Sequence, residues 1–156
     1  MKFHNQSLML AGFLMVTLGV TAIGGLATSR SVGSWYPMLI KPTWNPPGWV
    51  FGPVWTALYA MMAVAARLVW RQAGWCGALA LFGVQLALNA IWSPLFFGLH
   101  RIDLALADIV LLWAGVVATT AAFCNVTPVA GWLFVPYLLW VTFATALNFA
   151  LWRLNP

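Results

Sequence analysis

The sequence predicts an all-α membrane protein, a bundle of five transmembrane helices with a long first connecting loop that acts as a lid. Apolar residues make up 63% of the 156 positions, and the mean hydropathy is +0.92. Only 6% of the residues are charged, against about 25% in soluble domains. A spanning helix needs about 20 residues, so a chain of this length accommodates four to six spans. The same composition excludes a disordered chain, a nucleic-acid-binding basic domain and a secreted disulfide scaffold.

Uncharged runs locate the spans, because a charged side chain at mid-bilayer costs about 2.5 to 3.5 kcal/mol. Three runs between charged residues hold one span each. A fourth run of 44 residues, 109–152, is too long for one helix, and turn-forming residues near its middle divide it in two. The predicted helices of this single domain, 1–156, are 8–27, 47–70, 76–97, 103–124 and 130–153, and the lid loop is 28–45.

The first helix has an alternative interpretation as the apolar core of a signal peptide, since Lys2 precedes it and Gly25 and Ala27 are small. Its length of about 20 apolar residues favours a membrane helix. The orientation stays open, because the numbers of basic residues at the two ends are nearly equal. The N-terminal end has Lys2, Arg67 and Arg71, and the lid end has Arg30, Lys41, Arg101 and Arg153.

The lid loop and the prolines predict an internal cavity. The loop 28–45 is more aromatic and more basic than a passive link requires, and Asn45 is expected to cap the helix that follows. Pro53, Pro94 and Pro136 fall inside predicted helices, so each is expected to bend its helix and free a carbonyl group. Bent helices leave space between them.

Polar and aromatic side chains of four helices fall in one layer near the lid end. At a rise of about 1.5 Å per residue, four of them lie about 8 to 13 Å from that end: Trp55, Asn89, Asp108 and Asn148. Spacings of three and four residues place others on the same helix faces: Tyr59, Met62, Gln85, Trp92, Phe96, Tyr137, Trp140 and Ala144. Rings and amides that converge in one layer are typical of a small-molecule site.

Two structural alternatives apply to this layer. The amides of Gln85, Asn89 and Asn148 can simply hydrogen-bond neighbouring helices, as polar residues in membranes commonly do. An acid inside a membrane span indicates function, but Asp108 also has a structural alternative, an ion pair with Arg101 seven residues earlier.

The sequence offers no metal site and no conventional catalytic arrangement. His4 and His100 lack partners at ligand spacing, so neither a metal nor a haem ligand is indicated. Ser93 has no histidine or acid near it in the sequence, and no paired carboxylates exist for hydrolysis. No catalytic residue is predicted, and no cofactor is required.

A series of spaced motifs carries a family resemblance. The first block is Trp35-Tyr36, Lys41-Pro42-x-Trp44-x-Pro46-Pro47-Gly48-Trp49-Val50-Phe51 and Trp55-Thr56-x-Leu58-Tyr59. The later motifs are Gln85-Leu86-x-x-Asn89-x-x-Trp92-x-Pro94-x-Phe96-Phe97-Gly98, Ala105-Leu106-Ala107-Asp108, Val135-Pro136-Tyr137-Leu138-x-Trp140 and Ala144-Thr145-x-Leu147-Asn148. In this order, from about Trp35 to Asn155, they resemble the tryptophan-rich sensory protein and translocator protein family, also called peripheral-type benzodiazepine receptors.

The resemblance implies a five-helix bundle, often a homodimer, with a pocket that opens toward the first loop. Such pockets bind porphyrins, haem-related tetrapyrroles and benzodiazepine-type ligands. The matching motifs imply these pocket residues: Tyr36, Trp55, Asn89, Trp92, Trp140 and Ala144, with Asp108 nearby. Animal members also bind cholesterol through a C-terminal segment, but here Phe149 stands where the simple consensus has tyrosine, so the resemblance does not support sterol binding.

The first functional hypothesis is therefore a multi-pass membrane protein that binds tetrapyrroles for their sensing, regulation or handling. A flat macrocycle is expected to lie among Trp55, Trp92 and Trp140. Tyr36 would close the lid over it, and Arg30 or Lys41 would meet its carboxylates.

Two alternatives come from other functional classes. Some family members are reported to degrade protoporphyrin in light and oxygen, so whether the chain is an enzyme stays open. A transporter of tetrapyrroles or sterols is suggested by Asp108 and by the bent helices. The physiological ligand and the kind of membrane are not given by the sequence.

Overall fold

The computed structural model describes the backbone of residues 2–156 and the side chains of residues 11–20, 22, 24–29 and 31–156. Over this part of the chain the structure is helical, and five helices are long and apolar enough to cross a membrane. They are α1 (Lys2–Ser31), α2 (Phe51–Ala73), α3 (Gly77–Ser93, continued by a π turn, Pro94–Gly98), α4 (Ile102–Val126) and α5 (Pro128–Leu154). The predicted five-span, all-α fold is confirmed.

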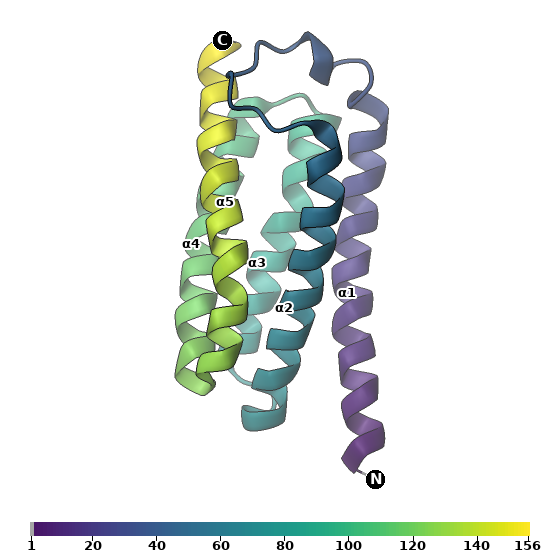
Figure 1. Cartoon of the computed structure of the whole chain (residues 1–156), viewed down its shortest axis with the longest axis vertical. Coiled ribbons are helices and arrows are strands. Elements are labelled where there is room, and N and C mark those ends of the chain that lie inside the picture. Colours follow the sequence, from purple (N-terminus) through teal and green to yellow (C-terminus); the bar gives the residue numbers. More distant parts are fainter. Residues whose placement is uncertain (1) are drawn as a thin grey trace.

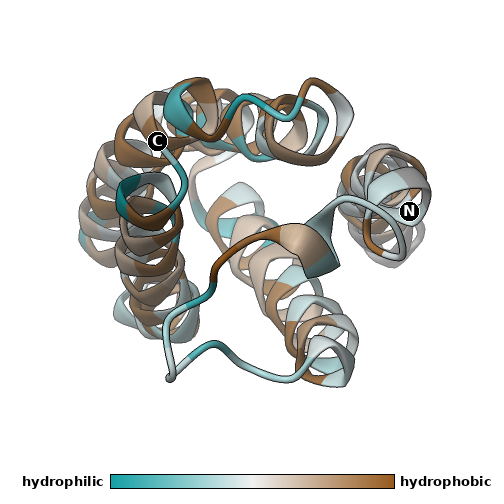
Figure 2. Ribbon diagram, turned by 90° about the horizontal axis from the view of Figure 1, so that it is seen from above, coloured by the Kyte–Doolittle hydropathy of each residue, from teal (hydrophilic) through white to brown (hydrophobic). Residues whose placement is uncertain are grey.

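The helices run up and down in one bundle (Figure 1). One end, called the loop end here, has the connection 32–47, the π turn and the C-terminus, and the N-terminus lies at the opposite end. Seen from the loop end, α1 lies at the edge of the bundle, where Figure 2 labels the N-terminus. Neighbouring helices of opposite direction follow from the short α2–α3, α3–α4 and α4–α5 connections.

The ends of the helices differ from the predicted bounds most in α1 and α2. α1 continues to Ser31, so the connecting loop begins later than predicted and covers 32–47. α2 begins at Phe51, after a 3₁₀ turn over Gly48–Val50, rather than at 47. Hydropathy locates the level of the bilayer, whereas backbone hydrogen bonding decides the ends of a helix, so the two bounds differ by a few residues in either direction.

The prolines act differently from the prediction at two of the three sites. Pro136 lies inside α5 as expected. Pro53 falls in the first turn of α2, where a proline costs little because the first amides lack helical partners. Pro94 ends the regular part of α3 and begins the π turn, so it redirects the chain at the helix end instead of bending a continuous helix.

The bundle is packed solidly in the half away from the loop end. Its buried side chains come from the last turns of α2, the first turns of α3 and α5, and the last turns of α4. Phe82, Phe123 and Phe134 form a ring cluster there, with centroids 4.9 to 6.1 Å apart. The half near the loop end is packed less completely, and the cavity described below lies in it.

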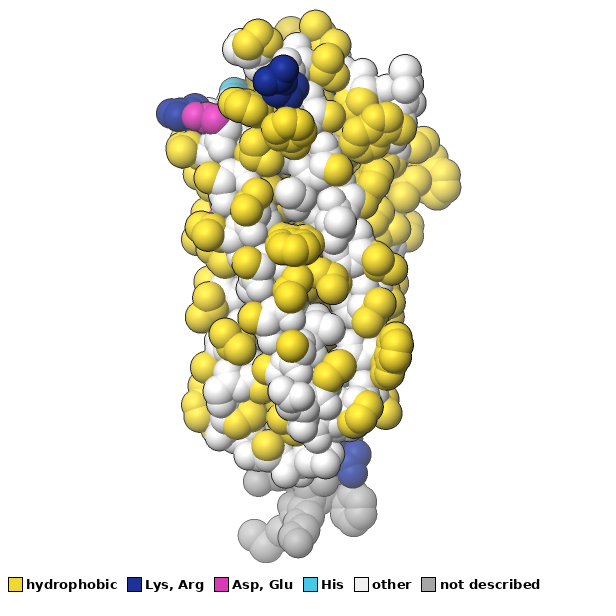
Figure 3. Space-filling model, turned by 90° about the vertical axis from the view of Figure 1, so that its left-hand side faces the viewer, with side chains coloured by type: hydrophobic (Ala, Val, Ile, Leu, Met, Phe, Trp, Pro, Cys, Tyr) yellow, Lys and Arg dark blue, Asp and Glu magenta, His cyan; other side chains and the backbone are white. Residues whose placement is uncertain are grey.

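The surface matches a membrane environment. Figure 3 shows one face of the molecule, where apolar side chains cover the middle and charged ones appear only near the two ends. Large apolar side chains such as Val84, Leu111 and Leu139 are exposed on the outside of the bundle. In water this surface would be unfavourable, whereas lipid tails solvate it.

Candidate ligand cavity

A cavity of about 400 Å³ lies among the helices in the half near the loop end. Four elements contribute most of its wall: α1, the start of α2, the end of α3 with its π turn, and the last four turns of α5. α4 reaches it only through Ile109 and Leu112. The volume is within the range of small-molecule sites, about 300 to 1,000 Å³.

Aromatic rings make up much of the wall. Trp55 on α2 stacks on Tyr59 one turn later, with ring centroids 5.3 Å apart and planes 28° apart. Trp92 on α3 stacks on Phe96 at 5.0 Å and 19°. Trp140 on α5 meets Phe51 edge to face at 5.8 Å. These contacts hold each indole against a neighbouring ring, so the wall is preorganised.

A buried hydrogen-bond network supports the wall between α2, α3 and α5. The Tyr59 hydroxyl donates to Asn89 Oδ1 at 2.6 Å, and Asn89 Nδ2 donates to the Tyr137 hydroxyl at 3.0 Å. The Tyr137 hydroxyl donates in turn to Gln85 Oε1 at 2.9 Å. The three- and four-residue spacing that predicted a shared face of α3 thus produces a chain of bonds across three helices. These bonds fix the Asn89 amide at the cavity wall.

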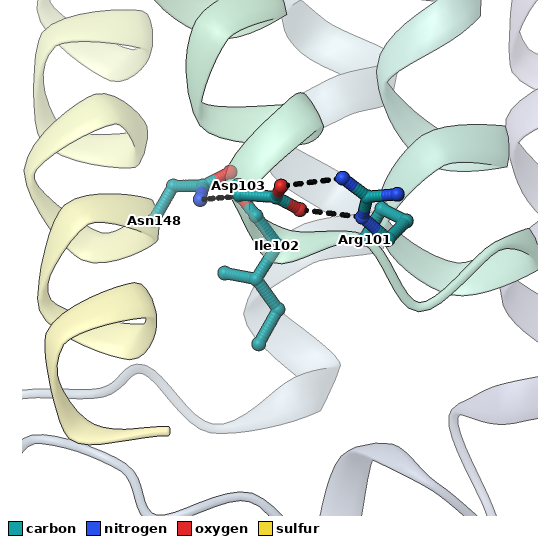
Figure 4. Close-up of polar contacts among 4 residues, drawn as sticks. All are labelled: Arg101, Ile102, Asp103 and Asn148. Carbon is teal, nitrogen blue, oxygen red and sulfur yellow. Dashed lines mark hydrogen bonds and ion pairs between the residues drawn. The ribbon is translucent and has the colours of Figure 1, made fainter. Parts of the chain in front are cut away.

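A second amide ties the cavity to the start of α4 (Figure 4). Asn148 Nδ2 donates to the carbonyl oxygen of Ile102 at 3.1 Å, and Asn148 Oδ1 accepts the indole N–H of Trp92 at 3.0 Å. The same close-up shows Arg101 and Asp103 in a two-point ion pair, at 2.8 and 2.6 Å. The alternative pairing of Arg101 with Asp108 is therefore wrong, because Arg101 uses the nearer carboxylate at the surface.

The connection 32–47 crosses the loop end and brings Tyr36 to the cavity. The Tyr36 hydroxyl donates to Asn45 Oδ1 at 3.0 Å, so Asn45 braces the loop and makes no side-chain cap on the following helix, contrary to the prediction. Burial raises the pKa of the Tyr36 phenol above its ordinary value of 10, partly offset by the hydrogen bond to Asn45, which lowers it.

The C-terminal end of α5 fastens the same loop. Asn155 Oδ1 accepts the backbone N–H of Ile40 at 2.9 Å, and Asn155 Nδ2 donates to the Ile40 carbonyl oxygen at 2.9 Å. Lys41, expected to meet ligand carboxylates, donates to the carbonyls of Pro37 and Leu39 and lies 4.8 Å from the centre of the Tyr36 ring. The side chain of Arg30, the other cation expected there, lies outside the described residues.

Comparison with known proteins identifies the family. The family model described as the TspO/MBR family matches residues 12–153. The chain belongs to the TspO/MBR family. It is 47% identical to a tryptophan-rich sensory protein of Cereibacter sphaeroides over 139 residues, 87% of this chain and 88% of that protein. It is 41% identical to protein CrtK of Rhodobacter capsulatus, over 92% of each chain. The human translocator protein is 44% identical over 126 residues, 78% of this chain and 75% of that protein.

Family membership and five candidate spans together make the chain an integral multi-pass membrane protein. The resemblance stated from the sequence motifs is therefore confirmed. The relatives cover most of this chain, so the comparison applies to the whole bundle and includes the cavity.

The structure brings six of the seven predicted site residues to one cavity, and these are Tyr36, Trp55, Asn89, Trp92, Trp140 and Ala144. Asp108 is buried but does not line the cavity, although the next residue, Ile109, does. Its Oδ2 is buried and has no hydrogen-bond partner among the described residues.

The largest part of the wall that the sequence did not predict comes from α1. Val20, Gly24, Gly25 and Thr28 line the cavity, and Gly24 lies against Ser93 on α3 so closely that a Cβ there would meet the Ser93 hydroxyl at 3.2 Å. The spacing of Gly24 and Thr28 by four residues was the available signal. It is a weak one, because small residues line many helix contacts in membranes.

Proposed function

We propose that this family member binds flat, apolar ligands of the tetrapyrrole class in the cavity and acts in their sensing, regulation or handling. The observation that carries the proposal is the wall itself: the indoles of Trp55, Trp92 and Trp140 enclose an apolar space beside the amide of Asn89. Aromatic faces stack on planar ring systems. A few fixed polar groups in an otherwise apolar pocket orient a ligand.

The unused hydrogen-bond donors of the wall support a ligand with acceptor atoms. The indole N–H of Trp92 donates to Asn148 Oδ1. Within the described part of the chain, those of Trp55 and Trp140 have no hydrogen-bond partner. Both residues line the cavity, so their N–H groups favour a ligand with nitrogen or oxygen acceptors.

Titration of the purified, detergent-solubilised protein with protoporphyrin tests the proposal, with the Soret absorbance of the porphyrin as the readout. Trp140→Ala removes one stacking surface and is expected to weaken binding about tenfold. The matched control is Trp132→Ala, since Trp132 is 71% exposed on the outside of the same helix. The control is expected to bind as the wild type does.

The two variants also separate loss of fold from loss of the site. Both must keep the helical circular dichroism and the melting temperature of the wild type within a few degrees. Equal affinity of Trp140→Ala and wild type would remove Trp140 from the binding site. Absence of saturable binding by the folded wild type would end the proposal.

A second candidate, light-driven oxidation of a bound tetrapyrrole, is favoured by one contact. Trp55 stacks on Tyr59, whose hydroxyl is hydrogen-bonded to Asn89, so two oxidisable side chains lie in series at the wall. Illumination of the complex in the presence of oxygen should then give a new absorbing product, and Trp55→Phe should slow its formation. The same bleaching by free tryptophan would deny the protein a role.

A further inference from the structure

Arg67 is a charged residue inside the membrane-spanning part of α2. The span covers Gly48–Ala73, and Arg67 lies about 9 Å before its end at a rise of about 1.5 Å per residue. The side chain is half-buried, and its Nε is fully buried without a hydrogen-bond partner among the described residues. Buried polar groups are nearly always hydrogen-bonded, so a partner for this guanidinium is to be expected.

The chain itself cannot supply an acidic partner. Asp103 and Asp108 are the two acidic side chains of the whole sequence, and Asp103 is paired with Arg101 at the loop end. Asp108 lies about 9 Å from the start of α4, whereas Arg67 lies about 24 Å from the start of α2. Both helices start at the loop end, so roughly 15 Å separates the two groups along the bundle. An ion pair needs about 4 Å, so the counter-charge must come from outside the protein.

A second cation and an aromatic pair mark the level of the membrane surface. Arg71 follows Arg67 by one helical turn and is exposed, so the two guanidinium groups share a face, where like charges repel each other. Trp70 and Trp75 contact each other edge to face at 6.5 Å, and Trp75 is 72% exposed. Tryptophans at helix ends lie at the headgroup level of a bilayer. Arg67 is therefore within reach of lipid phosphates, by extension of its side chain toward the surface.

The surface beside these arginines is suited to a lipid rather than to a soluble anion. Val64 and Ala60 lie one and two turns deeper, on the same side of α2 as Arg67, and both are exposed and apolar. An acyl chain can lie along them while its phosphate stays at the arginines. A soluble anion would interact with the two charges but would leave this apolar surface uncovered.

We propose that Arg67 and Arg71 bind the phosphate of an anionic phospholipid, in the leaflet at the end of the bundle opposite the loop. A guanidinium group binds phosphate through two parallel hydrogen bonds, and a phosphate between two arginines also removes their repulsion. The site is separate from the cavity, which lies in the other half of the bundle. The proposal for this lipid site does not depend on whether the cavity binds tetrapyrroles.

Native mass spectrometry of the detergent-solubilised full chain, titrated with phosphatidylglycerol or phosphatidylcholine of equal chain length, tests this site. The wild type is expected to retain phosphatidylglycerol preferentially. Each arginine near an anionic surface contributes roughly fivefold in affinity, so Arg67→Gln and Arg71→Gln should each weaken phosphatidylglycerol binding by about that factor. Phosphatidylcholine carries the same phosphate beside a cationic choline that arginines repel, so its binding should be weaker in the wild type and should change less in both variants.

The control variant is Arg153→Gln, which removes an exposed arginine at the loop end, in the last turn of α5. An equal loss of phosphatidylglycerol affinity in Arg153→Gln would mean that the lipid is attracted by the net charge of the protein, and it would overturn the proposed site. Displacement of the lipid by millimolar inorganic phosphate would overturn its assignment to a phospholipid. Should Arg67→Gln fail to fold, Arg71→Gln decides alone, and unchanged selectivity in it refutes the proposal.

Discussion

The hydroxyl of Tyr137 links α5 to α3 through two hydrogen bonds, and its removal tests the buried network directly. Tyr137→Phe deletes the acceptor of Asn89 Nδ2 and the donor to Gln85 Oε1 and leaves the ring in place. Tyr137 is fully buried, so water does not replace these bonds. Interhelical hydrogen bonds in membranes contribute about 0.6 kcal/mol on average and about 1.7 at most. Two of them predict a loss of roughly 1 to 3 kcal/mol in the free energy of unfolding.

Reversible unfolding in mixed dodecyl maltoside and SDS micelles, followed by circular dichroism, measures this loss. Tyr36→Phe is the matched control, since it removes the same atom from a half-buried tyrosine with one hydrogen bond inside the loop. It should cost less than Tyr137→Phe. Tyr137→Phe should also weaken porphyrin binding by a small factor, because Asn89 loses one of the two bonds that fix its amide at the wall.

A double-mutant cycle isolates the bond between Tyr137 and Gln85. Gln85 Nε2 is buried without a partner among the described residues. Gln85→Leu removes this unsatisfied donor, which is favourable, and also removes the acceptor of the Tyr137 hydroxyl, which is unfavourable. The single Gln85→Leu change is therefore expected to be nearly neutral. A coupling free energy of about 0.6 kcal/mol or more is expected from the cycle. A stability of Tyr137→Phe indistinguishable from wild type, with no coupling, would refute the network as a source of stability.

Three further outcomes are expected. Asn155→Ala removes both bonds to Ile40, so hydrogen exchange of the Ile40 amide and the dissociation rate of bound porphyrin should rise; unchanged rates would mean that the loop is not held there. Gly131→Ala places a Cβ 3.0 Å from backbone of α4 and should destabilise the bundle by about 1 to 3 kcal/mol, whereas Gly83→Ala, with open space around it, should not. Because the pKa of Tyr36 is raised in the fold, the contribution of its phenol to stability is constant below pH 10 and falls as the pH rises above 10. Tyr36→Phe should therefore reduce the loss of stability with pH in unfolding experiments from pH 8 to 11.

The parts of the structure that the sequence predicts are those set by local patterns. Five spans follow from uncharged runs, and shared faces follow from helical spacing. Thus Asn89, Trp92 and Phe96 lie on the cavity as their spacing indicates. Asp108 was predicted near the cavity from its depth and does not line it, because depth along a helix does not fix the direction of a side chain.

Contacts between distant parts of the chain were not predictable in this way. The bonds between Asn155 and Ile40 join residues 115 positions apart, and no periodicity in the sequence links them. Gly24 and Gly25 form part of the wall through their lack of a side chain, which leaves little pattern to detect. Asn45 had the residue type of a helix cap, but the hydroxyl of Tyr36 competes for its oxygen.

The most direct test of the account fills the cavity and removes no side chain from its wall. Ala144 lines the cavity, whereas Ala146, two residues later on α5, is exposed on the outside of the bundle. Ala144→Phe and Ala146→Phe therefore add the same ring inside and outside the site. Protoporphyrin titration of the two folded variants is predicted to show at least tenfold weaker binding for Ala144→Phe and wild-type binding for Ala146→Phe. Equal affinity of both variants would mean that the porphyrin binds elsewhere.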